Sequence, residues 1–459
     1  MIEKVGGRNA TADDVKFMYD TFQDTKVSRF YDNLEYLDRT EVVDKYTLRF
    51  HMKRPVMFFD QVMASSFYYI FPPEQLADKR VWDAWTIGTG PFMLQYHKFQ
   101  DHFEAVRHPK FTDVDRGGFR QPYVDRLYAP YRPDVNVGKA AFRSGQIDHL
   151  RVQGLTDLED MLATNPEAIV WIIPQDPNVH VAWAIQWKNP VWGNSETGLK
   201  MRRALSLALD RRGLTELIEG GAGVPSYATP YDFQGLKAPV HWDDLGPYYK
   251  HNVAEAKRLM AEAGYANGYD IEFLVASGGG SDAINVAAQQ QLAASGFRLT
   301  FKEVESTVRT GLLQNKDFKD VTSGGQDSGY DMEMNIYRLW ATPDATRNYG
   351  SVDDAILADL AQKQRYELDY DKRVQIARQV HARYLEIIPT LHLLSRHRMT
   401  VRHPWIHNWG DNIHSWLCCW GSQSSRQVFL DDTAPSGRGG KRGKEGTWGV
   451  PYDRQGRKV

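Results

Sequence analysis

The sequence predicts a protein of the α/β class, because strand and helix patterns alternate along its second half. Apolar residues recur at every second position from Ile271 to Val275, which is typical of a strand with one buried face. A helical pattern over 284–295 follows and is closed by Gly296, and a second strand pattern covers 297–301. Strand, helix and strand at this spacing form a βαβ unit. We therefore expect a partly parallel sheet in this region.

The elements of the first half of the chain are shorter. Thr11, followed three residues later by Asp14, is an N-terminal cap signature, so a helix is expected to begin there. Period-two alternation predicts a strand over 46–52. The segment Gly88–Phe92 contains two glycines and a proline, which favour a tight turn. Further strands are predicted at 92–96, 123–128, 169–173 and 179–187, and a helix at 137–144.

From about residue 191 onward, helical and strand patterns alternate. Gly220 and Gly264 each follow such a pattern, and glycine often ends a helix. Asn252 is expected to cap the second of these helices. Beyond Thr433, Gly, Lys and Arg dominate and core residues are scarce, so we expect a flexible tail. Helices are predicted over 200–219, 252–263, 353–366 and 372–386.

The composition narrows the possible classes of function. The chain has 459 residues, 42% of them hydrophobic, and a formal net charge of -2. This length allows about two to four domains with cores of their own. The near-neutral charge argues against a nucleic-acid partner, which would select a basic face. No run approaches the roughly 18 apolar residues of a membrane span. Cys418 and Cys419 are adjacent and cannot form an ordinary disulfide framework, so their role stays open.

The sequence contains no recognisable catalytic motif. There is no G-x-S-x-G elbow, no H-E-x-x-H and no complete phosphate loop. Acidic pairs such as Asp13-Asp14 fall at caps and turns, where backbone N–H groups favour carboxylates. Five histidines near the C-terminus have irregular spacing and no Cys or Glu at ligand offsets, so we predict neither a metal site nor a cofactor. These residues, expected to be packed or exposed, are His392, His397, His403, His407 and His414.

Six short segments occur in an order that matches one protein family. They are Thr11–Val15, Val42–Phe50, Gly88–Phe92, Ser144–Asp148, Arg202–Asp210 and Ala261–Tyr265. The third, Gly-Thr-Gly-Pro-Phe, is the most specific of them. Together they resemble the motifs of the family 5 extracellular solute-binding proteins, the peptide- and nickel-binding class of ABC importers. The resemblance covers roughly residues 8–430.

The resemblance implies a periplasmic-binding-protein type II-like fold, in which two α/β lobes surround a ligand cleft and an extra domain is attached. Family members also carry N-terminal strands and an export signal before the first motif. We therefore interpret the chain as N-terminally truncated and expect lobe I to expose a sheet edge. On this basis the extra-domain remnant is 1–86, lobe I is 87–190 with 395–430, lobe II is 191–394, and the tail is 431–459.

The resemblance also implies a ligand site. In peptide-binding members, an Asp before a D-P-D-like element receives the α-ammonium of the ligand. Asp327 occupies the matching place, and Asp331 starts a degenerate D-P-D element. Capping of a glycine-rich turn is the alternative role for Asp327. The family's tryptophan shortly before that Asp is absent, and Met332 replaces the proline, so a sugar, an opine or a metal complex stays open as the ligand.

Three aromatic residues are candidates for stacking on a ligand, namely Tyr337, Trp340 and Trp183. Packing in a core is the alternative role for each of them. The resemblance implies a monomer that captures a small molecule or peptide outside the cytoplasm, in the periplasm or anchored to lipid. It would deliver this ligand to the permease subunits of an ABC transporter and would not be an enzyme. A hydrolase without a recognisable motif is the other class of protein considered.

Overall fold

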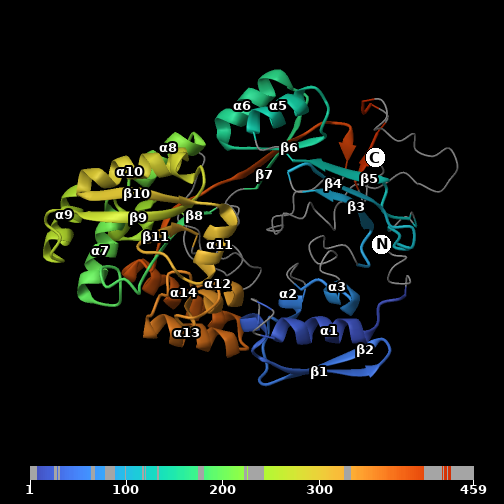
Figure 1. The fold of residues 1–459 in the computed structure, drawn as a ribbon, viewed down its shortest axis with the longest axis horizontal. Coiled ribbons are helices and arrows are strands. Elements are labelled where there is room, and N and C mark those ends of the chain that lie inside the picture. Colours follow the sequence, from blue (N-terminus) through green and yellow to red (C-terminus); the bar gives the residue numbers. More distant parts are fainter. Residues whose placement is uncertain are drawn as a thin grey trace.

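The computed structural model describes an elongated α/β protein (Figure 1). The described residues are 8–435, except for 25–27, 29–30, 64–67, 78–87, 99, 116–117, 119, 132–133, 174–179, 222–224, 226–241, 325–331, 408–425, 427 and 432.

The largest sheet has five strands in the order β10-β9-β11-β8-β12. β9 and β10 pair in parallel, with Tyr269 opposite Phe297 and Ala276 opposite Val304. This pairing confirms the predicted βαβ unit. β11 is parallel to β9, whereas β8 is antiparallel to both β11 and β12. The bounds are β8 (His180–Ile185), β9 (Tyr269–Ala276), β10 (Phe297–Val304), β11 (Val321–Ser323) and β12 (Thr390–Ser395).

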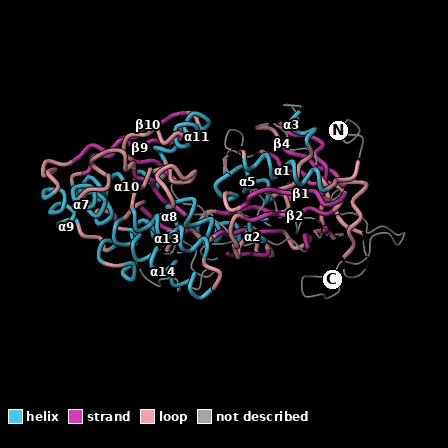
Figure 2. The backbone as a smooth tube through the Cα atoms, turned by 90° about the horizontal axis from the view of Figure 1, so that it is seen from below, coloured by secondary structure: helices cyan, strands magenta, loops and turns pink. Residues whose placement is uncertain are grey.

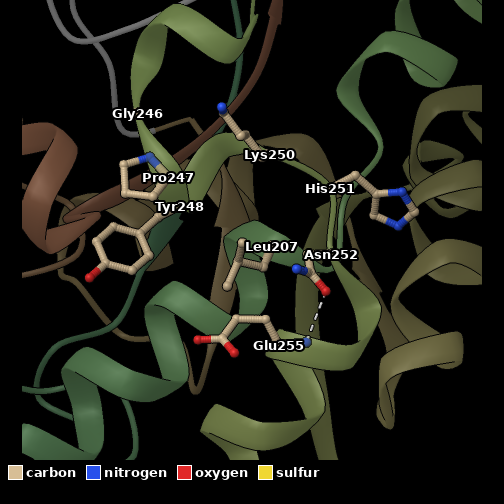
Figure 3. A pocket seen from close by; sticks show the side chains of 8 residues that line it. All are labelled: Leu207, Gly246, Pro247, Tyr248, Lys250, His251, Asn252 and Glu255. Carbon is tan, nitrogen blue, oxygen red and sulfur yellow. Dashed lines mark hydrogen bonds between the residues drawn. The ribbon is translucent and has the colours of Figure 1, made fainter.

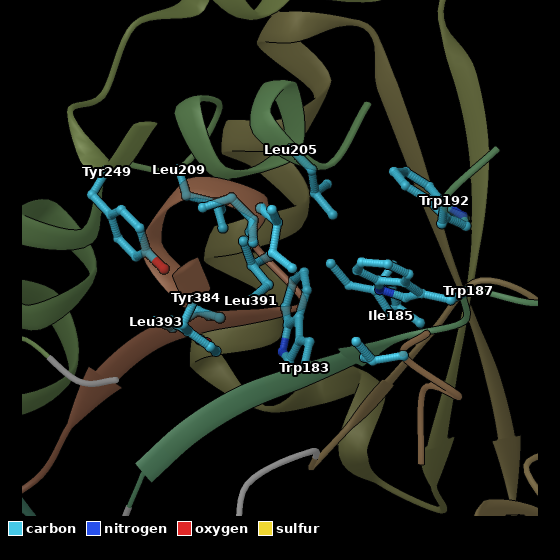
Figure 4. Close-up of a cluster of buried hydrophobic side chains, with 14 of the residues drawn as sticks. Trp183, Ile185, Trp187, Trp192, Leu205, Leu209, Tyr249, Tyr384, Leu391 and Leu393 are labelled. Atoms are coloured by element: carbon cyan, nitrogen blue, oxygen red, sulfur yellow. The ribbon is translucent and has the colours of Figure 1, made fainter. Parts of the chain in front are cut away.

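Helices pack against this sheet and form with it the largest hydrophobic core (Figure 4). Trp183 of β8 lies in that core beside Leu391 of β12. The helices of this core are α7 (Glu196–Leu207), α8 (Arg211–Glu219), α9 (Val253–Glu262), α10 (Ala283–Ser295), α12 (Met332–Trp340), α13 (Ala355–Tyr366) and α14 (Tyr370–Ile387). Helix α11 (Ser306–Gln314) instead contributes Leu313 to a smaller cluster with Leu274 of β9. Single 3-10 turns lie at Trp242–Leu245, Pro247–Tyr249 and Gly279–Ser281.

A second, smaller sheet has the order β6-β13-β7, and both β6 and β7 are antiparallel to β13. Helices α5 and α6 cover it with a core of their own, which includes Phe142, Met161 and Met399. Both outer strands of this sheet are edges among the described residues, and the exposed β7 side chains include Trp171. The bounds are α5 (Val135–Arg143), β6 (His149–Val152), α6 (Gly154–Thr164), β7 (Ile169–Ile173) and β13 (Arg398–Arg402).

Two further groups of strands lie near the second sheet (Figure 1). The antiparallel meander β3-β4-β5 follows the predicted tight turn, and the short pair β14-β15 joins two C-terminal segments. Tyr123, just before β5, donates its backbone N–H to the carbonyl of Arg426 at 3.2 Å, which ties the meander to the C-terminal part. The bounds are β3 (Phe92–Lys98), β4 (His102–Arg107), β5 (Arg126–Pro130), β14 (Ile406–His407) and β15 (Phe429–Leu430).

The N-terminal unit has a separate aromatic core, built from α1, the β1-β2 hairpin and the segments that follow. Tyr19 packs edge-on against Phe50, and Phe22 packs against Phe71. In the views of Figures 1 and 2 this unit lies toward the opposite end of the molecule from α9. The bounds are α1 (Ala12–Gln23), a 3-10 turn (Tyr31–Leu34), β1 (Leu37–Asp44), β2 (Thr47–Met52), α2 (Phe59–Met63) and α3 (Pro73–Ala77).

One predicted helix is wrong. The expected helix over 200–219 is two helices, α7 and α8, because the chain breaks at residues 208–210. The side chain of Asp210 accepts a hydrogen bond from the backbone N–H of Gly213 and so begins a new helix. The division of the chain into lobes stays a prediction, as does the flexible tail, most of which lies outside the described residues. None of the helices in the described part combines the length and apolarity that a bilayer crossing demands.

Candidate functional site

The chain passes twice between the five-stranded sheet and the sheet β6-β13-β7. It runs from β7 to β8, and it returns from β12 to β13 through only Arg396 and His397. Glu219, at the end of α8, lies at this return with its Oε1 2.9 Å from Nε of Arg396. Burial raises the pKa of Glu219, and the positive charges of Arg396 and Arg151 oppose that rise. Two sheets that are joined by such connections can rotate about them, as in a hinge.

The parallel strands β9, β10 and β11 end at the same edge of the five-stranded sheet, and α/β proteins commonly bind ligands outside the carboxyl ends of such strands. After β9, the backbone N–H groups of Gly278 and Gly280 donate to Glu303 at 2.9 and 3.2 Å. After β10, Glu305 caps α11 by accepting from the backbone N–H groups of Thr307 and Val308. Carboxylates of the chain itself therefore occupy both groups of backbone donors.

Arg309, in the second turn of α11, reaches the end of β11. Its Nη2 donates to the hydroxyl of Thr322 at 3.2 Å and to the hydroxyl of Ser323 at 2.7 Å, and it also contacts the carbonyl of Ser323. Burial lowers the pKa of this guanidinium. The sequence patterns do not single out Arg309, because an arginine on a short helix is usually an exposed residue.

The predicted ammonium partners follow β11 directly in the chain. Gly324 continues that edge, with a backbone N–H that donates to the carbonyl of Ala182 at 2.8 Å. Asp327 and Asp331 lie outside the described residues, and α12 begins at Met332. Their role in ligand binding stays a prediction.

The three predicted stacking residues are buried in the large core. Trp183 is 1% exposed and packs on Phe273 with ring centroids 4.6 Å apart. Trp340 is 3% exposed and lies 5.9 Å from the ring of Tyr384. Core packing accounts for both rings, and Figure 4 shows Trp183 among aliphatic side chains. Contact with a ligand stays a prediction for both tryptophans.

Tyr337 belongs to a polar network between α12 and the N-terminal unit. Its hydroxyl donates to Oε2 of Glu35 at 2.7 Å, and Arg365 lies over its ring at 3.2 Å from the centroid. Nη1 of Arg365 also donates to Glu35 at 2.9 Å, while its Nε donates to Glu333 at 2.6 Å. Glu333 is 0% exposed and Arg365 is 1% exposed. A ligand-stacking role for Tyr337 likewise stays a prediction.

The same network extends to Asp32 of the N-terminal unit. Nη2 of Arg365 donates to the backbone carbonyl of Asp32 at 2.6 Å. The carboxylate of Asp32 accepts from the backbone N–H of Thr346 at 3.3 Å and contacts its hydroxyl. Nε of Arg338 lies 3.6 Å from Oδ1 of Asp32. Charged groups of the N-terminal unit are therefore joined to the α12–α13 region.

The C-terminal histidines have structural contacts. His403 is stacked between Phe142 and Trp405, and its Nε2 lies 2.9 Å from the carbonyl of Phe142. His407 pairs with Asp431 at 2.6 Å. No group of three or more His, Cys, Asp or Glu side chains arranged to hold a metal ion occurs in the described part of the chain. His414, Cys418 and Cys419 lie outside it.

A pocket lies beside the start of α9 (Figure 3). Asn252, which lines this pocket, caps α9 by accepting a hydrogen bond from the backbone N–H of Glu255 at 3.0 Å. Its side-chain oxygen thus has a partner within the helix start. In Figures 1 and 2, α9 lies at the far end of its lobe from α11. The lining residues are Leu207, Gly246, Pro247, Tyr248, Lys250, His251, Asn252 and Glu255.

The motif at Arg202–Asp210 has a structural explanation. Arg202 is 2% exposed, and its guanidinium donates to the carbonyl of Ile387 at 2.9 Å and to that of Gly193 at 2.7 Å. It also lies 3.8 Å from the ring centroid of Trp187. This arginine therefore joins α7 to the end of α14. Packing and hydrogen bonding therefore account for an arginine at this position.

The fold resembles that of solved solute-binding proteins. The Agrobacterium tumefaciens R10 protein AgaA, solved in complex with agropinic acid, superposes with a TM-score of 0.76 at 21% identity, over 93% of this chain and 84% of that one. The Bacillus subtilis oligopeptide-binding protein AppA, solved in complex with a nonapeptide, gives a TM-score of 0.75 at 20% identity, over 92% and 84%. These likenesses define the fold class as that of the type II periplasmic binding proteins.

The sequence comparison gives the family. The profile described as "Bacterial extracellular solute-binding proteins, family 5 Middle" matches residues 7–386. The chain belongs to this family, as its six motifs predict. A Brucella ovis protein named as an ABC transporter peptide-binding protein is 28% identical over 271 residues, which are 56% of this chain and 47% of that protein. AppA of Bacillus subtilis is 24% identical over 72% of this chain and 62% of its own length. The matched region thus spans about half the length of the first of these relatives.

Proposed function

We propose that the chain is the substrate-binding component of an ABC importer, which captures a peptide-like or other small solute between two lobes and delivers it to a membrane permease. The match of the family profile over residues 7–386 carries this proposal. The two connections between the five-stranded sheet and the sheet β6-β13-β7 support it, because capture requires rotation of one lobe toward the other. The family name supports a site of action outside the cytoplasm, in the periplasm or anchored to lipid.

The two lobes in this proposal are 87–190 with 395–430 and 191–394, and the protein acts as a monomer. A charged ligand end needs a partner when the lobes exclude water, because an unpaired buried charge is costly. Asp327 is the proposed partner of an ammonium group, with Asp331 beside it in the chain. Gly324 supports this choice, since its contact with Ala182 brings the chain to the carboxyl edge of β11 just before these residues.

An opine is a second candidate ligand on the same fold. The structure of AgaA with agropinic acid is as similar to this chain as that of AppA with a nonapeptide, with TM-scores of 0.76 and 0.75. Overall similarity therefore does not favour a peptide over an opine. The absence of the tryptophan that is common shortly before the aspartate at 327 also weakens the peptide pattern.

A thermal-shift screen tests the proposal. The chain is heated with di- to pentapeptides, agropinic acid, sugars and metal salts, and each mixture is afterwards analysed by mass spectrometry. Because a ligand that binds only the folded state stabilises it, we expect one solute class to raise Tm while its mass stays unchanged. Consumption of that solute would instead identify an enzyme. If no solute raises Tm, the capture proposal is wrong for this chain.

A further inference from the structure

We infer that Arg309 is an anion-binding residue of the ligand site and that the solute therefore carries a carboxylate. This inference rests on the proposed function, because it assumes that the solute reaches the carboxyl edge of β9, β10 and β11. It concerns the negative end of the solute, whereas Asp327 is the proposed partner of a positive end.

Arg309 is a cation that pairs with none of the described carboxylates. All its hydrogen bonds to described residues come from Nη2, toward Thr322 and Ser323. Its Nε is buried and makes no hydrogen bond, and no ion pair joins this guanidinium to a carboxylate among the described residues. The side chain is half-buried, and burial lowers its pKa. A partly buried charge without a counter-charge is unfavourable, and a bound anion would relieve that cost.

Other arginines of the same lobe differ from Arg309 in this respect. Arg202 is fully buried and donates through both Nε and Nη1 to backbone carbonyls. Arg211 likewise donates through Nε, Nη1 and Nη2 to His392 and Ser206. Arg365 has the carboxylate of Glu333. The hydrogen bonds of these three guanidiniums stabilise the fold, whereas Nη1 of Arg309 makes no hydrogen bond to any described residue.

The position of Arg309 points to the proposed ligand site. α11 lies on the side of the five-stranded sheet that faces the rest of the molecule in both views (Figures 1 and 2). The backbone donors nearby are already engaged, those of Gly278 and Gly280 by Glu303 and those of Thr307 and Val308 by Glu305. Within the described part of this edge, Arg309 is a cation that retains N–H donors for an anion. A guanidinium fork suits a carboxylate, which accepts two parallel hydrogen bonds.

Matched pairs of ligands test this inference. The di- to pentapeptides and their C-terminal amides differ only in the carboxylate, and succinate serves as a probe with carboxylates alone. A hydrogen bond to a charged group gives about 10- to 100-fold in affinity, so we expect each binding acid to have a Kd lower than that of its amide by this factor. Arg309→Gln should reduce the ratio of the two Kd values to near one. A purely structural role would weaken the acid and the amide equally.

Arg298→Gln is the control, because Arg298 is exposed at the opposite end of β10 and pairs with Asp270. It should leave the acid-to-amide ratio unchanged. If acids and amides bind the wild type equally, or if Arg309→Gln keeps the wild-type ratio, the inference about Arg309 is wrong while solute capture stands. If succinate alone raises Tm, and only when Arg309 is present, the anion site stands and peptide capture is wrong. If no probe binds, both are wrong.

Discussion

Arg365 gives the sharpest test of what holds the N-terminal unit in place, because it pairs with Glu333 and also donates to Glu35 of that unit. Glu333 is 0% exposed and Arg365 is 1% exposed, with Nε and Oε1 2.6 Å apart. Arg365→Met keeps most of the side-chain volume but leaves the carboxylate of Glu333 buried without its cation, while Gln364 Nε2 still donates to this carboxylate at 2.8 Å. Breaking a buried ion pair on one side costs about 3–5 kcal/mol. The variant also loses the donors to Glu35 and to the Asp32 carbonyl.

The assay is urea denaturation followed by far-ultraviolet circular dichroism. We expect the free energy of unfolding of Arg365→Met to fall by about 3–5 kcal/mol. The double variant with Glu333→Met should recover most of this loss, because it removes the unpaired charge. Arg258→Gln is the control, since Arg258 pairs with Glu255 and Glu262 on the exposed face of α9, and its urea midpoint should not change. A loss below about 1 kcal/mol in the single variant, or no recovery in the double variant, would refute the reasoning.

Three further predictions concern the lobe that contains α11. Asp320→Ala removes the carboxylate that accepts from four donors, among them the buried Trp192 Nε1 at 2.9 Å, and should cost about 3 kcal/mol or more in urea denaturation, whereas Asp320→Asn should cost less. Gly198→Ala should lower Tm, because its Cβ would collide with the carbonyl of Gly193, while Gly311→Ala in an open helical position should raise it. Burial lowers the pKa of His381 from 6.5 to about 4, so the unfolded chain takes up this proton first as pH falls. Stability should therefore drop by about 2 kcal/mol between pH 7 and 5, and His381→Asn should flatten that slope.

Local signals explain which elements the sequence predicts. Thr11 and Asp14 form the expected capping box of α1, and the helix begins at Ala12. The βαβ unit is also local, since β9, α10 and β10 follow each other directly. The apolar pattern of the sequence does not indicate the break between α7 and α8. Ala208 and Leu209 are both buried, so the apolar pattern continues through the break, and only the capping contact of Asp210 reveals it.

Long-range pairing explains what the sequence does not predict. β12 is buried at all six positions and has no period-two alternation, and it pairs with β8, far away in the chain. Arg365 has the pattern of an exposed helical charge, yet its acidic partners Glu333 and Glu35 are 32 and 330 positions away. The candidate site has the same property. Arg309 becomes a candidate binding residue only because the fold places α11 beside the end of β11, where its guanidinium contacts Ser323.

The charged network and the aromatic core of the N-terminal unit have different effects on the docking of this unit. Tyr366 of α13 packs against the aromatic core, and such apolar contact is favourable over many relative orientations. The hydrogen bonds from Arg365 to Glu35 and to the Asp32 carbonyl are directional, so they select one orientation. The double variant Arg365→Met with Glu333→Met should therefore retain stability while the N-terminal unit loses its fixed orientation. Faster proteolysis between that unit and β3, at a urea midpoint close to that of the wild type, would be its signature.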